Sequence, residues 1–198
     1  MQKPANNIYP IHPLIRKRWS PRAFLTKSVE KDKLQSLFEA ARWAASGSND
    51  QPWQFIVGFN GDETWNRIFE TLVEFNQLWT KEVPVLLVAC ANTISKKSGR
   101  KNPSYEYDLG QAVATLSLQA THMGLFVHQM GGFDKAKTVL LFELPNTSKP
   151  IVAIAIGYYG DVGQLHPNLQ PLEEARRVRN DFDTFVFVKN HGNPSGLF

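Results

Sequence analysis

A short stretch in the first half of the chain gathers side chains suited to contacting a planar polar ligand. Residues 46–55 read Ser-Gly-Ser-Asn-Asp-Gln-Pro-Trp-Gln-Phe. Their hydroxyls and amides both donate and accept hydrogen bonds, so they can match a heterocycle whose edge alternates carbonyls and ring nitrogens. Gly47 allows a tight backbone path, and Pro52 biases Gln51 toward an extended conformation. Ordinary polar loops have a similar composition, so this stretch alone leaves ligand binding open.

A second stretch, near the N-terminus, has the charge and spacing of a phosphate-binding segment. Arg18, Ser20 and Arg22 occupy alternate positions, and such positions project to one side of an extended segment. Two guanidinium groups can bind a phosphate through paired hydrogen bonds, and a hydroxyl can add another. A solvated basic segment would have the same composition, so both interpretations stay open at this point.

Other common kinds of chemical site are not indicated by the sequence. A Gly-x-Ser-x-Gly nucleophile elbow is absent, and Cys90 lies in an apolar run where a thiol is more often inert packing. The five histidines do not follow a zinc-binding spacing. The Walker and Rossmann glycine patterns are absent as well. We therefore predict no metal site and no hydrolytic nucleophile.

The elements that position these two stretches follow from apolar periodicity and turn residues. Ser28 is a candidate helix cap, and Asp134 is expected to cap a short helix that ends before Pro145. Alternation of strands with helices predicts α/β or α+β architecture. The pattern predicts helices over 29–45, 63–75, 105–123 and 171–179, and strands over 53–59, 83–91, 125–130, 151–158 and 184–188.

Composition fits one globular domain and narrows the class of partner. The chain has 198 residues and a net charge of +4, and its 22 lysines and arginines are scattered rather than clustered. Scattered charge argues against a nucleic-acid-binding protein. The apolar runs are shorter than the ~20 residues needed to span a bilayer, so no membrane partner is expected. A single cysteine cannot form an internal disulfide, and we expect a cytoplasmic protein.

Several segments in order resemble the nitroreductase family, from about residue 12 to residue 188. Ala45 stands where the family usually has proline, and Gly131 stands where many relatives have glutamate. The segments that carry the resemblance are Arg18-Trp19-Ser20-Pro21-Arg22, residues 46–53, Asn76, Asp108-Leu109-Gly110, Gly131-Gly132-Phe133-Asp134 and Ile156-Gly157-Tyr158.

The resemblance implies an α+β fold of three layers, in which helices flank a central, mostly antiparallel sheet. It implies one domain over residues 1–198 in an intertwined homodimer. A C-terminal segment, about 164–198, would wrap the partner subunit, and the strand over 184–188 could extend the partner's sheet. Such pairing would satisfy the hydrogen bonds of an edge strand.

The resemblance also implies a bound FMN. The FMN phosphate and ribityl end would be held by the N-terminal arginine segment together with two C-terminal arginines. Amides of the 46–51 loop, from the other subunit, would contact the ribityl chain and pyrimidine ring, and backbone N–H groups of the diglycine would lie near the flavin N5. The implied cofactor-binding residues are Arg18, Trp19, Ser20, Arg22, Ser46, Gly47, Asn49, Gln51, Asn76, Met130, Gly131, Gly132, Arg177 and Arg179.

By the same resemblance the protein is an FMN-dependent oxidoreductase with ping-pong kinetics. NAD(P)H would reduce the flavin, and a nitroaromatic, quinone or similar acceptor would reoxidise it. A flavin performs its own electron chemistry, so no catalytic side chain is expected. Enone reduction, reductive dehalogenation, or a redox sensor without efficient turnover are alternatives on the same fold. We expect residues 75–79 and 92–104 to determine which acceptor is used. Residues 92–104 are expected to form a mobile surface loop near a substrate entrance.

Overall fold

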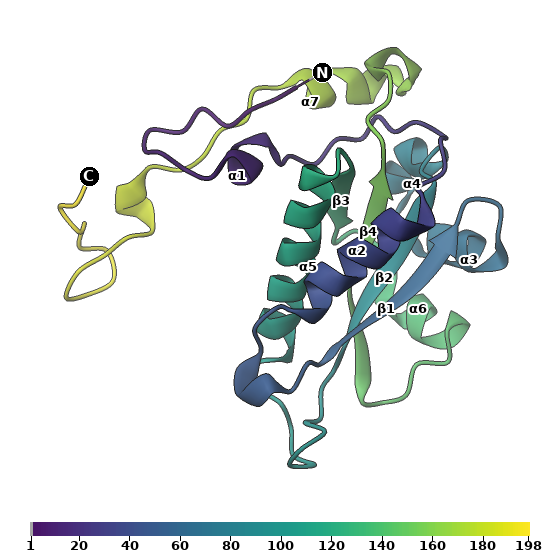
Figure 1. The fold of residues 1–198 in the computed structure, drawn as a ribbon, viewed down its shortest axis with the longest axis horizontal. Coiled ribbons are helices and arrows are strands. Elements are labelled where there is room, and N and C mark those ends of the chain that lie inside the picture. Colours follow the sequence, from purple (N-terminus) through teal and green to yellow (C-terminus); the bar gives the residue numbers. More distant parts are fainter. Residues whose placement is uncertain (1) are drawn as a thin grey trace.

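The computed structural model describes residues 2–198, with one antiparallel sheet at its centre (Figure 1). The sheet has the order β1-β2-β4-β3, and every neighbouring pair is antiparallel. β2 and β4 lie in the middle and are buried on both faces, which explains their continuous apolar sequences. The strands are β1 Trp53–Phe59, β2 Val85–Asn92, β3 Phe126–Met130 and β4 Ser148–Gly157.

Helices cover both faces of the sheet and complete three layers. α2 (Lys31–Arg42) and α5 (Tyr105–His122) pack on one face, where they meet residues such as Leu87 and Ala89 of β2. α3 (Glu63–Thr71), α4 (Glu74–Thr80) and α6 (Lys135–Leu141) lie on the side of the intervening residues Leu86 and Val88. The α+β, three-layer prediction is confirmed. Within residues 2–198 no helix combines the length and apolarity that a bilayer crossing needs.

The two ends of the chain form an arm that leaves the body side by side (Figure 1). The arm includes α1 (Pro13–Lys17) and, after α7 (Gln170–Glu174), the C-terminal residues. Arg177 Nη1 donates to the carbonyl of Lys3 at 2.7 Å. The Tyr9 ring lies 5.5 Å from the rings of Phe182 and Phe198. The arm is therefore held together mainly by contacts between its N-terminal and C-terminal segments, rather than by contacts with the sheet.

Two predicted helices differ from the structure. The helix predicted over 63–75 is divided into α3 and α4, because Leu72 pairs with Phe133 and Val73 N donates to the carbonyl of Gly132 at 3.1 Å. The helix predicted over 171–179 ends at Glu174. Tertiary hydrogen bonds to the diglycine segment thus replace the helical bonds that the local sequence favours.

The strand predicted over 184–188 is wrong for the chain as described. This segment begins at the end of a 3-10 turn, Phe182–Thr184, and its only described pairing is a single bridge between Phe187 and Pro194. The Ser28 cap is also wrong, since Glu30 occupies the N-cap of α2 without a side-chain bond. The Asp134 cap is confirmed, because its carboxylate accepts from Lys137 N at 2.9 Å.

Candidate functional site

The two predicted groups of arginines meet at one cavity of about 260 Å³, which we call the arginine cavity. The first group comes from the segment that leads into the body after α1, and the second comes from the chain after α7. The residues from the predicted site that line the cavity are Arg18, Trp19, Ser20, Arg22, Arg177 and Arg179. The alternate spacing of the first group therefore does place its side chains on a common side.

A buried carboxylate fixes the backbone of the first group. Glu173 of α7 is only 1% exposed, and its carboxylate accepts from Arg22 N at 2.9 Å and from Ala23 N at 3.3 Å. Trp19 anchors the same segment, with its ring 5.4 Å from that of Tyr159. The arginine side chains therefore project from a backbone that tertiary contacts hold in place.

The arginine cavity carries more positive charge than Glu173, the carboxylate among its lining residues, can neutralise. Burial, together with the charge of Arg179, lowers the pKa of Arg18 below its ordinary value. Burial and the charges of Arg18 and Arg179 lower the pKa of Arg177. The Nε of Arg22 is buried and has no hydrogen-bond partner within residues 2–198. Crowded cations and an unsatisfied buried donor fit a bound phosphate dianion.

His128 joins the arginine segment to β3. Its Nδ1 lies 2.7 Å from the carbonyl of Pro21, and its ring lies 4.6 Å from that of Trp79. Burial lowers the pKa of His128 to about 4, and the charge of Arg22 acts in the same direction. The imidazole is therefore neutral near pH 7, and Nδ1 carries the proton that is donated to Pro21.

The diglycine at the end of β3 lies beside Asn76. Asn76 of α4 is buried, and its Nδ2 donates to the carbonyl of Gly132 at 2.9 Å. Met130 is buried, whereas Gly131 is exposed. The guanidinium of Arg22 lies 5.8 Å from the ring of Phe75, the residue before Asn76. The arginine cavity and the diglycine are thus neighbouring parts of one surface.

The two glycines of this pair should respond differently to the same substitution. A Cβ at Gly132 would lie 2.9 Å from Val73 Cγ2 and 3.0 Å from Asn76 Nδ2, whereas a Cβ at Gly131 would meet nothing within 4 Å. We expect Gly132→Ala to lower the free energy of unfolding by about 1–3 kcal/mol through overpacking, and Gly131→Ala to change it little. Urea denaturation of both variants measures this, and equal destabilisation would contradict the geometry.

The 46–51 loop has an unusual backbone that presents its amides to solvent. Ser48, Asn49 and Gln51 have φ values of 54°, 54° and 50°. The expectation that Pro52 makes Gln51 extended is therefore wrong. The loop holds this conformation through Gln51 N, which donates to Ser46 Oγ at 3.1 Å, and Gly47 N, which donates to Asp108 Oδ1 at 3.1 Å. Asn49 and Gln51 remain exposed, with Gln51 Nε2 3.1 Å from Asn49 Oδ1.

One chain does not bring this loop to the arginine cavity. The loop is bonded to Asp108 near the start of α5, whereas Trp19 and His122 line a common cavity at the other end of that helix. The 18 residues of α5 span about 27 Å. Figure 1 shows the 46–51 loop at one end of α5 and the segment that follows α1 at the other end. The predicted binding residues therefore form two separate groups within the chain.

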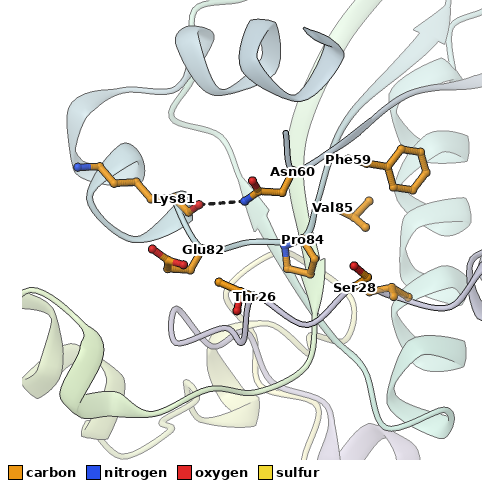
Figure 2. A pocket seen from close by; sticks show the side chains of 9 residues that line it. Thr26, Ser28, Phe59, Asn60, Lys81, Glu82, Pro84 and Val85 are labelled. Carbon is orange, nitrogen blue, oxygen red and sulfur yellow. Dashed lines mark hydrogen bonds between the residues drawn. The ribbon is translucent and has the colours of Figure 1, made fainter. Parts of the chain in front are cut away.

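A larger cavity lies away from both groups. This cavity has a volume of about 430 Å³. Figure 2 shows the side chains that line it, among which Asn60 Nδ2 donates to the carbonyl of Lys81 at 3.0 Å. The cavity lies where β1 ends and β2 begins. Its lining consists of Thr26, Ser28, Val29, Phe59, Asn60, Lys81, Glu82, Pro84 and Val85. None of the predicted binding residues is among them, so size alone does not identify the functional site.

Two acidic residues that support the site were not predicted. Glu173 anchors the arginine segment. Asp50, within the 46–51 loop, binds Ser95 of the segment that follows β2. Asp50 is 7% exposed, although aspartate is mostly a surface residue. A single sequence gives no signal that separates such buried carboxylates from solvated ones, because their burial depends on distant segments.

Comparison with known families decides the identity of the fold. The model of the nitroreductase family matches residues 15–74 and 60–158, which is most of the chain. The chain belongs to the nitroreductase family. The resemblance of its sequence segments to that family is confirmed.

Two curated proteins are similar to the chain to different extents. An uncharacterized 15.4 kDa protein in ask 5'region of Mycolicibacterium smegmatis is 27% identical over 152 residues, 71% of this chain and 99% of that protein. The Major NAD(P)H-flavin oxidoreductase of Aliivibrio fischeri is 33% identical over 109 residues, 52% of this chain but only 46% of that enzyme.

Solved structures support the same nitroreductase fold. An oxidoreductase containing FMN has a TM-score of 0.86 and 33% identity, covering 95% of this chain and 96% of its own. A nitroreductase family protein from Clostridium difficile 630 has a TM-score of 0.69 and 23% identity, covering 89% of this chain and 96% of its own, and shows the fold alone.

Proposed function

We propose that this nitroreductase-family protein is an FMN-dependent oxidoreductase that accepts hydride from NAD(P)H and reduces a small acceptor, such as a nitroaromatic or a quinone. The arginine cavity carries the proposal, since it joins crowded guanidinium groups and an unsatisfied Arg22 Nε to the neighbouring diglycine surface. An FMN-containing oxidoreductase and an NAD(P)H-flavin oxidoreductase among its relatives support the same chemistry. We also propose a cytoplasmic location, which suits its buried free thiol, Cys90.

The residues present fit the parts of FMN. Arg18, Arg22 and the C-terminal arginines would hold the phosphate, and Ser20 would contact the ribityl end. Gly131 is exposed, and its N–H could approach the isoalloxazine ring without a side chain in the way. FMN, when bound, supplies hydride acceptance and electron transfer. The protein's part is to bind and orient the ring and to stabilise negative charge at its edge.

We propose that two copies form each site. Asn49 and Gln51 lie about one length of α5 away from the arginine cavity of their own chain, so they would serve the cavity of a partner. The extended arm, with about residues 164–198, would wrap that partner. Exposed apolar side chains along the arm support this role, since Ile8 and Val178 are each 77% exposed.

A visible absorption spectrum of the purified protein tests the proposed function. We expect a flavin spectrum that bleaches when NADPH is added without oxygen and recovers when a quinone is added. If excess FMN does not stay bound after desalting, the cofactor assignment fails. A flavin that binds but is not bleached by either NADPH or NADH would instead contradict the oxidoreductase activity while leaving the FMN site in place.

A further inference from the structure

The segment after β2 forms a short hairpin that carries a cluster of positive charge. Ile94 pairs with Lys101 in an isolated bridge, and Ser95 N donates to the carbonyl of Arg100 at 2.8 Å. Gly99, with a φ of 67°, closes the turn. The sequence predicts a mobile surface loop over residues 92–104; residues 94–101 of that loop pair in the structure, and its mobility stays a prediction. We call these residues the basic hairpin.

Asp50 fixes the base of the basic hairpin. Its Oδ1 accepts from Ser95 Oγ at 2.8 Å and from Lys96 N at 3.1 Å. Its Oδ2 accepts from Asn102 Nδ2 at 3.0 Å. This buried carboxylate is thus satisfied by neutral donors, and it does not use the ammonium or guanidinium groups of the hairpin.

A second set of hydrogen bonds joins the same region to the 46–51 loop. Asn102 Oδ1 accepts from Ser104 N at 2.9 Å, and Ser104 Oγ donates to Asp108 Oδ2 at 3.0 Å. The other carboxylate oxygen of Asp108 accepts from Gly47 N, and Lys97 Nζ donates to the carbonyl of Ser48. The basic hairpin and the loop that presents Asn49 and Gln51 are therefore one connected unit.

The positive side chains of the basic hairpin face solvent without acidic partners. Lys96, Lys97, Arg100 and Lys101 are exposed, and none takes part in an ion pair within residues 2–198. Residues 94–104 contain no aspartate or glutamate. This arrangement fits an anionic ligand that approaches from solvent, close to the amides of the 46–51 loop.

We propose that the basic hairpin binds the phosphates of the nicotinamide donor, in particular the adenosine 2′-phosphate, so that NADPH is preferred over NADH. The inference rests on the proposed function, which makes the 46–51 loop one wall of the flavin site. A phosphate monoester adds about −1.5 to −2 charges near pH 7, and this charge distinguishes NADPH from NADH. The hairpin residues do not line the arginine cavity of their own chain, so they are not among the residues that we assign to the FMN phosphate.

Calorimetric binding of two adenine nucleotides to the purified protein tests the inference without turnover. Adenosine 2′,5′-bisphosphate carries the distinguishing phosphate, and 5′-AMP lacks it. We expect Arg100→Ala/Lys101→Ala to weaken binding of the bisphosphate about tenfold and that of 5′-AMP less than about twofold, since two solvent-exposed charges are lost. Lys31→Ala/Lys135→Ala removes two exposed charges elsewhere and should change neither affinity.

Three results would overturn the inference. Unchanged affinity for the bisphosphate would show that the hairpin does not bind it, and equal weakening for both nucleotides would show no recognition of the 2′-phosphate. Loss of bound FMN in the Arg100→Ala/Lys101→Ala variant would assign the hairpin to the flavin instead. The calorimetric comparison can be made at any flavin content, so failure of FMN to bind the wild type would reject the proposed function separately.

Discussion

Replacing Arg18 by alanine should weaken FMN binding about tenfold to a hundredfold without destabilising the flavin-free protein. A hydrogen bond between charged groups contributes about 1.5–3 kcal/mol, which sets the expected loss. Arg18 lies among Arg177 and Arg179 in the arginine cavity, and their charges disfavour one another. Removing one cation therefore relieves repulsion in the flavin-free protein while it removes a phosphate ligand. Fluorescence titration with FMN and thermal melting of the flavin-free protein measure the two effects.

Arg16→Ala is the matched control for this experiment. Arg16 is exposed, lies outside the arginine cavity, and contributes its backbone carbonyl, not its side chain, to the bond with Arg177. It should leave FMN affinity nearly unchanged. Equal FMN affinity in Arg18→Ala and wild type would remove Arg18 from the phosphate site.

Arg22→Ala should also weaken FMN retention without unfolding the protein.

Replacing Glu173 by alanine should cause the largest loss of stability among the predicted variants. Its carboxylate accepts from the N–H groups of Arg22 and Ala23, and both would lose a partner at a position where the side chain is almost fully buried. Unsatisfied buried groups cost about 1–3 kcal/mol each, so we expect a loss of about 2–4 kcal/mol in the free energy of unfolding. Chemical denaturation of the flavin-free protein measures this loss.

Glu173→Ala should also weaken FMN binding, because the arginine segment loses its backbone anchor. Glu174→Ala is the matched control, since Glu174 is the next residue of α7 and is exposed. Glu173→Gln should be intermediate, because an amide has one acceptor oxygen where the carboxylate has two. A Glu173→Ala protein as stable as Glu174→Ala would show that this carboxylate does not hold the segment.

The fold could be predicted wherever one stretch of sequence determines its own environment. β2 has a continuous apolar sequence because it is covered on both faces, and α5 has an apolar stripe because one side meets the sheet. The break between α3 and α4 could not be predicted. It depends on bonds to Phe133 and Gly132, which are distant in sequence.

The candidate site could be predicted in its parts but not in its assembly. The alternate spacing of Arg18, Ser20 and Arg22 predicts that their side chains project to one side of an extended segment. In the structure all three line one cavity. The residues that hold this backbone, Glu173 and His128, gave no local signal, because their partners lie on other elements. The positive φ of Gln51 was missed since the bonds around the loop outweigh the local bias imposed by Pro52.

The span of α5 has a thermodynamic consequence for flavin content. On the proposed arrangement, each site exists only when two chains associate, because the 46–51 loop and the arginine cavity lie at opposite ends of this helix. Mass action then links the two equilibria: FMN tightens the association of the chains, and dilution of the protein releases FMN. Flavin occupancy would thus report the concentration of the protein itself.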